Sequence, residues 1–196
     1  MEFCTLKAGK PVAAAAGFAL FLAGLLAAPL SAQQNPPQTG AAQQAQKPKA
    51  KNYKDRGEYD LYSKVVKTTD PQQRLQLLNT WKDKYPNSDF KEDRLKYFVA
   101  TLAQLAQKDA SQRPPLIETC ETLLKLDPND FYANYYVSLY GPQVPATPQL
   151  AGEVQTSANA LLKLADTVFA PDKKKANMTD QQWTQAKNQV LAVGHN

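Results

Sequence analysis

Apolar residues recur every three or four positions from about residue 57 to the C-terminus, and short polar segments separate the runs. This spacing places the apolar side chains on one face of a helix. The chain shows no sustained alternation of apolar and polar residues and no Asn-Gly or Asp-Gly turn, which argues against strands. We therefore predict an all-α protein of about seven helices. The expected helices begin near Gly57, Pro71, Ser88, Pro114, Asn129 or Asp130, Pro148 and Thr179.

Several of these starting points carry capping residues. Asp70 precedes Pro71, which suits the first helical position because proline has no N–H to donate. Thr179 is followed three positions later by Gln182, the spacing of a capping box. Ser88 precedes a run of acidic residues that favours the positive end of a helix dipole.

The apolar stripes predict which residues form the core. The first helix is expected to bury Tyr59, Tyr62 and Val66, which lie at helical spacing. Other helices carry longer stripes, and short amphipathic helices of this kind need their neighbours for stability. The most regular of these stripes consists of Leu95, Phe98, Val99, Leu102, Leu105 and Ala106.

Two similar segments mark helix boundaries, KYPNS at residues 84–88 and LDPND at 126–130. Their prolines lie 42 residues apart, and each segment stands between two predicted helices. These boundaries resemble those of tetratricopeptide (TPR) repeats, and the first is similar to boundaries in exported bacterial TPR proteins. The chain departs from that family in its longer spacing, against about 34 residues, and in Lys96, which stands where the family has a small residue.

The resemblance implies a short solenoid of stacked helix-turn-helix repeats with a concave groove that binds a peptide or protein segment. In the TPR register, two of the repeats place residues on the inner face. We expect Tyr132 and Tyr135 to be exposed there, with Asn134 as an orienting amide; alternatively, most of the aromatic rings fill the core. The implied groove residues are Phe90, Asp93, Tyr97, Tyr132, Asn134 and Tyr135.

The N-terminal part of the chain predicts export. Residues 1–32 read as a signal peptide, with Lys7 and Lys10 ahead of an apolar run that ends in small residues. Residues 33–52 contain mainly Gln, Pro, Ala and Lys, which predicts a disordered linker. Residues 53–196 form the helical domain. The protein is therefore expected to be periplasmic or secreted, or tethered to a membrane if the signal segment stays uncleaved.

Charge and chemistry narrow the function further. The net charge of +5, or +4 without residues 1–32, is too small and too scattered to indicate nucleic-acid binding. The one histidine, His195, lies next to the C-terminus, and Cys120 is the one cysteine of the predicted mature chain, expected to be buried. Glu118 and Glu121 are expected on a solvated face with ordinary pKa values. We predict no catalytic, cofactor or metal site.

These observations predict an exported, non-enzymatic module that binds a protein or peptide partner in a helical groove. Three alternatives stay open. A structural or assembly subunit of a cell-envelope complex would expose an apolar patch on the convex face or at the last helix. An enzyme would need clustered carboxylates in a cleft. A truncated copy of a longer TPR protein would leave Trp183 and Val190 uncovered on the last helix.

Overall fold

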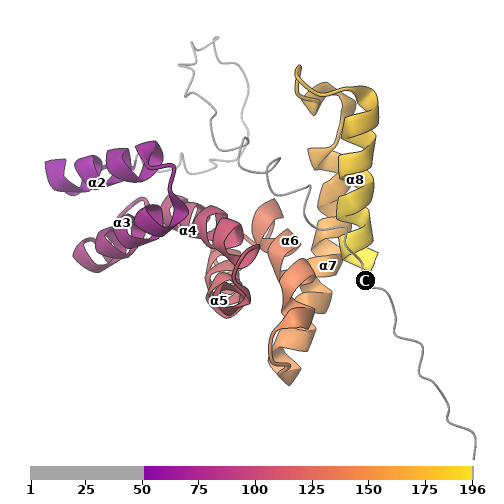
Figure 1. Cartoon of the computed structure of the whole chain (residues 1–196), viewed down its shortest axis with the longest axis horizontal. Coiled ribbons are helices and arrows are strands. Elements are labelled where there is room, and N and C mark those ends of the chain that lie inside the picture. The colour runs from indigo at the N-terminus through magenta and orange to yellow at the C-terminus, as the bar shows by residue number, and fades with distance from the viewer. Residues whose placement is uncertain (1–50, 196) are drawn as a thin grey trace, which may run out of the picture. The chain divides into compact units, whose positions relative to one another are not determined.

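The computed structural model describes residues 51–195, which form seven α-helices and three short 3-10 segments, with no strand in that range (Figure 1). The prediction of an all-α fold with about seven helices is confirmed. The predicted signal segment and most of the predicted linker lie outside the described residues. The helices are α2 (Arg56–Lys67), α3 (Pro71–Lys84), α4 (Lys91–Ala106), α5 (Arg113–Leu124), α6 (Phe131–Tyr140), α7 (Pro148–Val168) and α8 (Asp180–His195).

Most helices begin where the capping residues predict. Asp70 accepts a hydrogen bond from the backbone N–H of Gln73 at 2.7 Å, so α3 starts at Pro71. At the start of α8, Thr179 and Gln182 form the reciprocal capping box, with distances of 2.9 and 3.1 Å. Each bond satisfies a backbone donor that the first turn of a helix leaves without a partner.

The starts of α6 and α4 refine the predictions. Asp130, and not Asn129, caps α6 and accepts the N–H of Ala133 at 2.9 Å. Ser88 does not directly precede α4, which begins at Lys91. Its hydroxyl instead accepts the N–H of Phe90 at 2.9 Å in the turn ahead of the helix. The predicted start was early because this polar turn uses the same residue types as a cap.

The helices pack in the order in which they follow one another. Each helix from α2 to α8 contacts the next along the chain, and α4 also contacts α6 while α6 contacts α8. Contacts between neighbours and between alternate helices are those of helix-turn-helix pairs stacked as a short solenoid. None of the helices in residues 51–195 has the length and apolar character needed to cross a bilayer.

The core is a continuous row of apolar side chains contributed by every helix. α4 buries nearly all of its predicted stripe, and Cys120 of α5 is fully enclosed as predicted. Burial of such side chains supplies most of the stability of helices that are too short to stand alone. The largest fully buried apolar side chains are Trp81, Leu78, Leu116, Leu123, Leu161, Val65, Val99, Val137 and Val190.

The predicted buried face of the first helix is wrong. In α2, Tyr59 and Val66 are 43% and 49% exposed, whereas Glu58 and Val65 are fully buried. The helix is rotated because the Glu58 carboxylate accepts hydrogen bonds from Trp81 Nε1 at 2.9 Å and from the backbone N–H of Lys54 at 2.7 Å. A buried carboxylate is tolerated when donors satisfy it in this way.

A second carboxylate holds the start of α2 against the end of α3. Asp55 accepts the N–H of Glu58 at 2.9 Å and the phenol O–H of Tyr85, the residue that follows α3, at 2.7 Å. The hydrogen bond from Tyr85 lowers the pKa of Asp55. One side chain therefore caps α2 and joins it to the first of the two repeat boundaries.

The end of α3 is also held from α4. The buried Arg94 guanidinium donates from Nη1 to the carbonyl oxygens of Tyr85 at 2.8 Å and of Trp81 at 3.3 Å. Its Cζ lies 5.6 Å from the centre of the Trp81 ring. These carbonyl groups also accept the backbone N–H groups of Tyr85 and Ser88, so the arginine adds a contact from the next helix to an end that is already hydrogen-bonded.

The apolar face of the last helix packs against the rest of the described chain. Val190 is fully buried, and the Trp183 ring is half-buried against Phe169, with its Nε1 donating to the Phe169 carbonyl at 3.2 Å. The outward side of α8 is polar, with exposed Gln181, Gln185 and Asn188. An exposed apolar patch at this helix, expected for an assembly subunit, is likewise missing from the described residues.

Replacement of Glu58 by glutamine tests the polar contact that orients α2. Burial opposes the Glu58 charge, but hydrogen bonds from Ser88, the Lys54 N–H and Trp81 outweigh it and lower the pKa. The Glu58→Gln side chain loses one acceptor oxygen and turns an amide donor toward existing donors. We expect urea denaturation at pH 7 to show a loss of about 1.5–3 kcal/mol in unfolding free energy.

The exposed Glu118→Gln is the matched control and should leave the unfolding free energy unchanged. Equal stability of the two variants would show that Glu58 does not hold α2 in place.

Candidate functional site

The six predicted groove residues separate into two groups in the structure. Phe90, Asp93 and Tyr97 are half-buried at the start and along one side of α4. Tyr132, Asn134 and Tyr135 belong to α6. Of these three residues, only Tyr132 is partly exposed. The two helices contact each other, so the groups lie on neighbouring elements. Residues 51–54 cover the first group, and neighbouring helices cover the second.

The first group is covered by the chain itself. Residues 51–54, here called the basic segment (KNYK), lie ahead of α2 without regular secondary structure. The Tyr53 ring stacks on the Phe90 ring with 4.2 Å between centroids and 14° between planes. Lys51 Nζ lies 2.6 Å from Asp93 Oδ2, and Lys54 Nζ lies 3.0 Å from Asp89 Oδ1. Lys51 and Asn52 are also the last two residues of the predicted linker.

Tyrosines from α2 continue this surface. Tyr62 lies 5.7 Å from Tyr53 and 6.2 Å from Tyr97, between ring centroids. We call Tyr53, Tyr62, Phe90 and Tyr97 the α2/α4 aromatic cluster. Burial, followed by the neighbouring tyrosines and Asp93, raises the pKa values of Tyr53 and Tyr97 to about 12. Their hydroxyl groups therefore stay protonated at neutral pH and can donate hydrogen bonds at the rim of an apolar surface.

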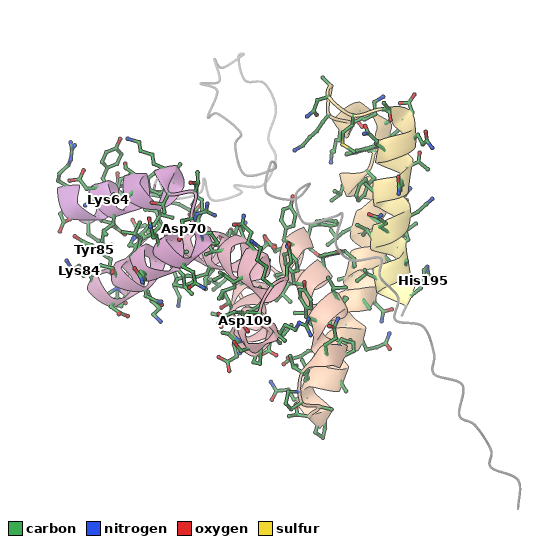
Figure 2. All side chains as sticks on the ribbon, viewed as in Figure 1. Lys64, Asp70, Lys84, Tyr85, Asp109 and His195 are labelled. Carbon is green, nitrogen blue, oxygen red and sulfur yellow. The ribbon has the colours of Figure 1, made fainter. Side chains whose placement is uncertain are left out.

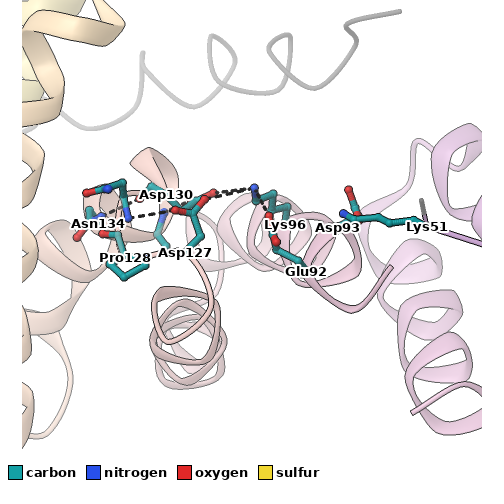
Figure 3. A network of polar contacts seen from close by, with 10 residues as sticks. Lys51, Glu92, Asp93, Lys96, Asp127, Pro128, Asp130 and Asn134 are labelled. Carbon is teal, nitrogen blue, oxygen red and sulfur yellow. Dashed lines mark hydrogen bonds and ion pairs between the residues drawn. The ribbon is translucent and has the colours of Figure 1, made fainter. Parts of the chain in front are cut away.

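A lysine connects this surface to the α5–α6 turn (Figure 3). Lys96 Nζ lies 2.8 Å from Glu92 Oε1, 3.5 Å from Asp127 Oδ2 and 3.7 Å from Asp130 Oδ2. Burial opposes the charge of Lys96, but the contact with Glu92 and the two aspartates raise its pKa. Lys96 therefore balances Glu92 on its own helix and two aspartates at the second boundary segment.

The expected exposure of Tyr135 is wrong, and Asn134, expected as an orienting amide, is buried. Tyr135 is 5% exposed and Asn134 is 2% exposed. Asn134 Nδ2 donates to the carbonyl oxygens of Pro128 at 3.0 Å and Asp130 at 2.9 Å, so its amide fastens the turn and cannot orient a ligand. The cause is the position of α6, which contacts α4, α5, α7 and α8 and has nearly every face covered.

Tyr132 retains a partly exposed ring, and burial raises its pKa, with a smaller contribution from Asp130. The other tyrosines of α6, Tyr136 and Tyr140, are buried and stack with their rings 6.2 Å apart. The alternative in which most of these rings fill the core therefore holds for α6. Exposed aromatic surface gathers instead around α2 and the start of α4.

The structure also contains a carboxyl pair that the sequence did not reveal. Glu121 of α5 and Glu153 of α7 share a hydrogen bond at a cavity of about 440 Å³ between α5, α6 and α7. Burial, with the bond to Glu153, raises the pKa of Glu121 to about 7, while the same bond lowers the pKa of Glu153. Below pH 7 the pair therefore favours a form in which Glu121 is protonated and Glu153 is ionised.

The prediction of an ordinary solvated Glu121 is therefore wrong, although Glu118 is exposed as expected. Gln149 Nε2 donates to Glu153 Oε1 at 2.8 Å, and Lys125 favours the ionised forms of both carboxyl groups. The partners of Glu121 come from a helix about 30 residues further along the chain. A periodic pattern within α5 carries no signal of such a contact.

Groups suited to covalent or metal chemistry are dispersed. Among residues 51–195, no three His, Cys, Asp or Glu side chains are placed to hold a metal ion. Cys120 is fully buried, and burial raises its pKa well above the ordinary value, so its thiol stays protonated. His195 is exposed at the end of α8 (Figure 2).

Comparison of the chain with known proteins found no similar protein. No protein-family model matches the chain, and neither the curated proteins nor the solved structures gave a match. The resemblance to TPR proteins therefore remains a prediction from the two boundary segments.

The carboxyl pair predicts that stability depends on pH. Because the folded pKa of Glu121 is raised from about 4.5 to about 7, the folded protein retains a proton that the unfolded chain releases between these values. Stability should therefore fall as the pH rises from about 4.5 to 7. In Glu121→Gln the amide still donates to Glu153 without ionising, and we expect its Tm at pH 8 to exceed that of the wild type by roughly 2–4 °C.

Thermal unfolding followed by circular dichroism between pH 4 and 9 measures this dependence. The control Glu118→Gln, on the same helix, should follow the wild type throughout. A Glu121→Gln curve parallel to the wild-type curve at every pH would exclude the shared proton.

Proposed function

We propose that the protein is an exported, non-enzymatic binding module that holds an extended segment of a partner protein against the face formed by α2, α4 and the α5–α6 turn. The export part of this proposal rests on residues 1–32, whose composition is that of a signal peptide. The binding part rests on the surface described above. The fold supports the proposal because stacked helix pairs form extended surfaces on which partners can bind.

One observation carries the binding proposal. The chain's own basic segment lies on this face in an irregular conformation, held by a stacked ring and by two lysine–carboxylate pairs. A surface that accommodates four residues of its own chain through side-chain contacts has the shape and chemistry to accommodate such a segment from another protein. Half-buried tyrosines are also the residues that protein interfaces favour, because they combine apolar area with a hydrogen-bonding tip.

The alternative of an assembly subunit finds one feature in its favour. α2 exposes Tyr59 and Val66, the two most exposed large apolar residues on any helix of the described chain. Tyr59, however, also contacts the Tyr53 ring at 5.3 Å and the Arg56 guanidinium at 5.2 Å. Its exposed surface is thus continuous with the α2/α4 aromatic cluster, which favours a single binding face over a separate assembly patch.

Selection from a peptide display library on the immobilised full chain tests the proposal. Selected peptides should bind the wild type and lose at least tenfold in affinity for Asp93→Lys, because this change puts a cation in the centre of the face. Asp172→Lys makes the same chemical change at an exposed position between α7 and α8 and serves as the control.

Peptides that bind Asp93→Lys and the wild type equally would place the binding surface elsewhere. Failure to select any peptide, with a folded target confirmed by circular dichroism, would contradict the proposal directly.

A further inference from the structure

We infer that the partner presents lysines on either side of a tyrosine in an extended segment, and that this segment binds by displacing the chain's own residues 51–54. The inference rests on the proposed function and specifies the partner's chemistry. The basic segment then acts as a built-in competitor that occupies the face until a partner with matching side chains arrives.

The contacts of the basic segment define an ordered pattern. Lys51 contacts Asp93, Tyr53 contacts Phe90, and Lys54 contacts Asp89. Residue numbers rise along the segment while those of its contacts fall from Asp93 to Asp89, so the segment runs antiparallel to the first turn of α4 and the turn that precedes it. Extended residues advance about 3.3 Å each and helical residues about 1.5 Å, so lysines three positions apart can reach carboxylates four positions apart through their long side chains.

The charges of the face select a basic segment. Five carboxylates, Asp89, Glu92, Asp93, Asp127 and Asp130, belong to the start of α4 and to the α5–α6 turn. Lys96 contacts three of them, while Lys51 and Lys54 contact the other two. When the basic segment leaves, two carboxylates lose their lysines. An incoming segment restores this balance only if it carries cations at the same spacing.

The aromatic position is selected in a similar way. The Tyr53 ring lies against Phe90 in a parallel stack and meets Tyr59 and Tyr62 at larger angles. An aromatic side chain from a partner fits this space when Tyr53 vacates it, whereas an aliphatic side chain forgoes the ring-to-ring contacts.

The basic segment is held in a way that permits exchange. Both of its ion pairs join partly exposed side chains, and pairs of this kind add little to stability in water. The segment is nevertheless favoured because it is tethered, which gives it an effective concentration in the millimolar range. A free peptide with the same contacts therefore binds the wild-type chain weakly, and weakening the tethered segment strengthens that binding.

Fluorescence anisotropy with a labelled peptide of sequence Ala-Lys-Asn-Tyr-Lys-Ala, titrated with the full chain, tests this inference. The expected result is weak binding to the wild type and binding about tenfold tighter to Tyr53→Ala, which vacates the ring position. Lys51→Glu, which leaves every ring in place, should also bind the peptide more tightly. The double variant Tyr53→Ala/Asp93→Lys should lose the gain.

Three outcomes would overturn the inference. The first is equal binding of the peptide to the wild type, Tyr53→Ala and Lys51→Glu, all shown to be folded. The second is equal binding of a control peptide with the same residues in the order Ala-Tyr-Lys-Lys-Asn-Ala. The third is concentration-dependent dimerisation of the wild type that Asp93→Lys abolishes, because the occupant would then be a second copy of the chain.

Failure here is distinguishable from failure of the proposed function. Display-selected peptides that depend on Asp93 but lack the lysine–tyrosine pattern would uphold a binding face and reject the partner chemistry. Absence of any Asp93-dependent peptide would reject both.

Discussion

The proposed binding face depends on one buried carboxylate. Glu58 accepts hydrogen bonds from Trp81 and from the backbone of Lys54, and these bonds set the rotation of α2 about its own axis. That rotation turns Tyr62 toward Tyr97 and leaves Tyr59 beside Tyr53. α2 is a short helix whose main helical contact is with α3, so apolar packing alone constrains it weakly. A polar contact of defined geometry supplies the missing constraint.

The two repeat boundaries are held by residues two positions apart on α4. Arg94 reaches back to the carbonyl groups at the end of α3, and Lys96 reaches forward to the aspartates before α6. Through these two side chains, α4 joins the α3–α4 turn to the α5–α6 turn. This arrangement gives the long basic side chain of Lys96 a role in joining α4 to the α5–α6 turn. The boundary segments resemble each other in sequence, but each is stabilised by a different cation.

The turns of this fold could be predicted from the sequence, whereas some of its faces could not. Asp70, Thr147 and Thr179 act within one helical turn of their own position, so a local pattern suffices to identify them. The face of α2 was missed because a charged residue takes a core position once distant donors satisfy it. The burial of Tyr135 and the contact between Glu121 and Glu153 depend on helices remote in sequence. An apolar stripe predicts which face of a helix is buried, but it does not predict how many other helices pack around that helix.

The position of Asp55 links the basic segment mechanically to the start of α2. Asp55 follows Lys54 directly, and its carboxylate both caps α2 and receives the hydroxyl group of Tyr85. Pulling residues 51–54 away therefore loads the first turn of α2 and its junction with the end of α3. The stability of α2 therefore depends on whether residues 51–54 occupy the proposed face. A pulling force transmitted through these residues acts on α2 before it acts on the other helices.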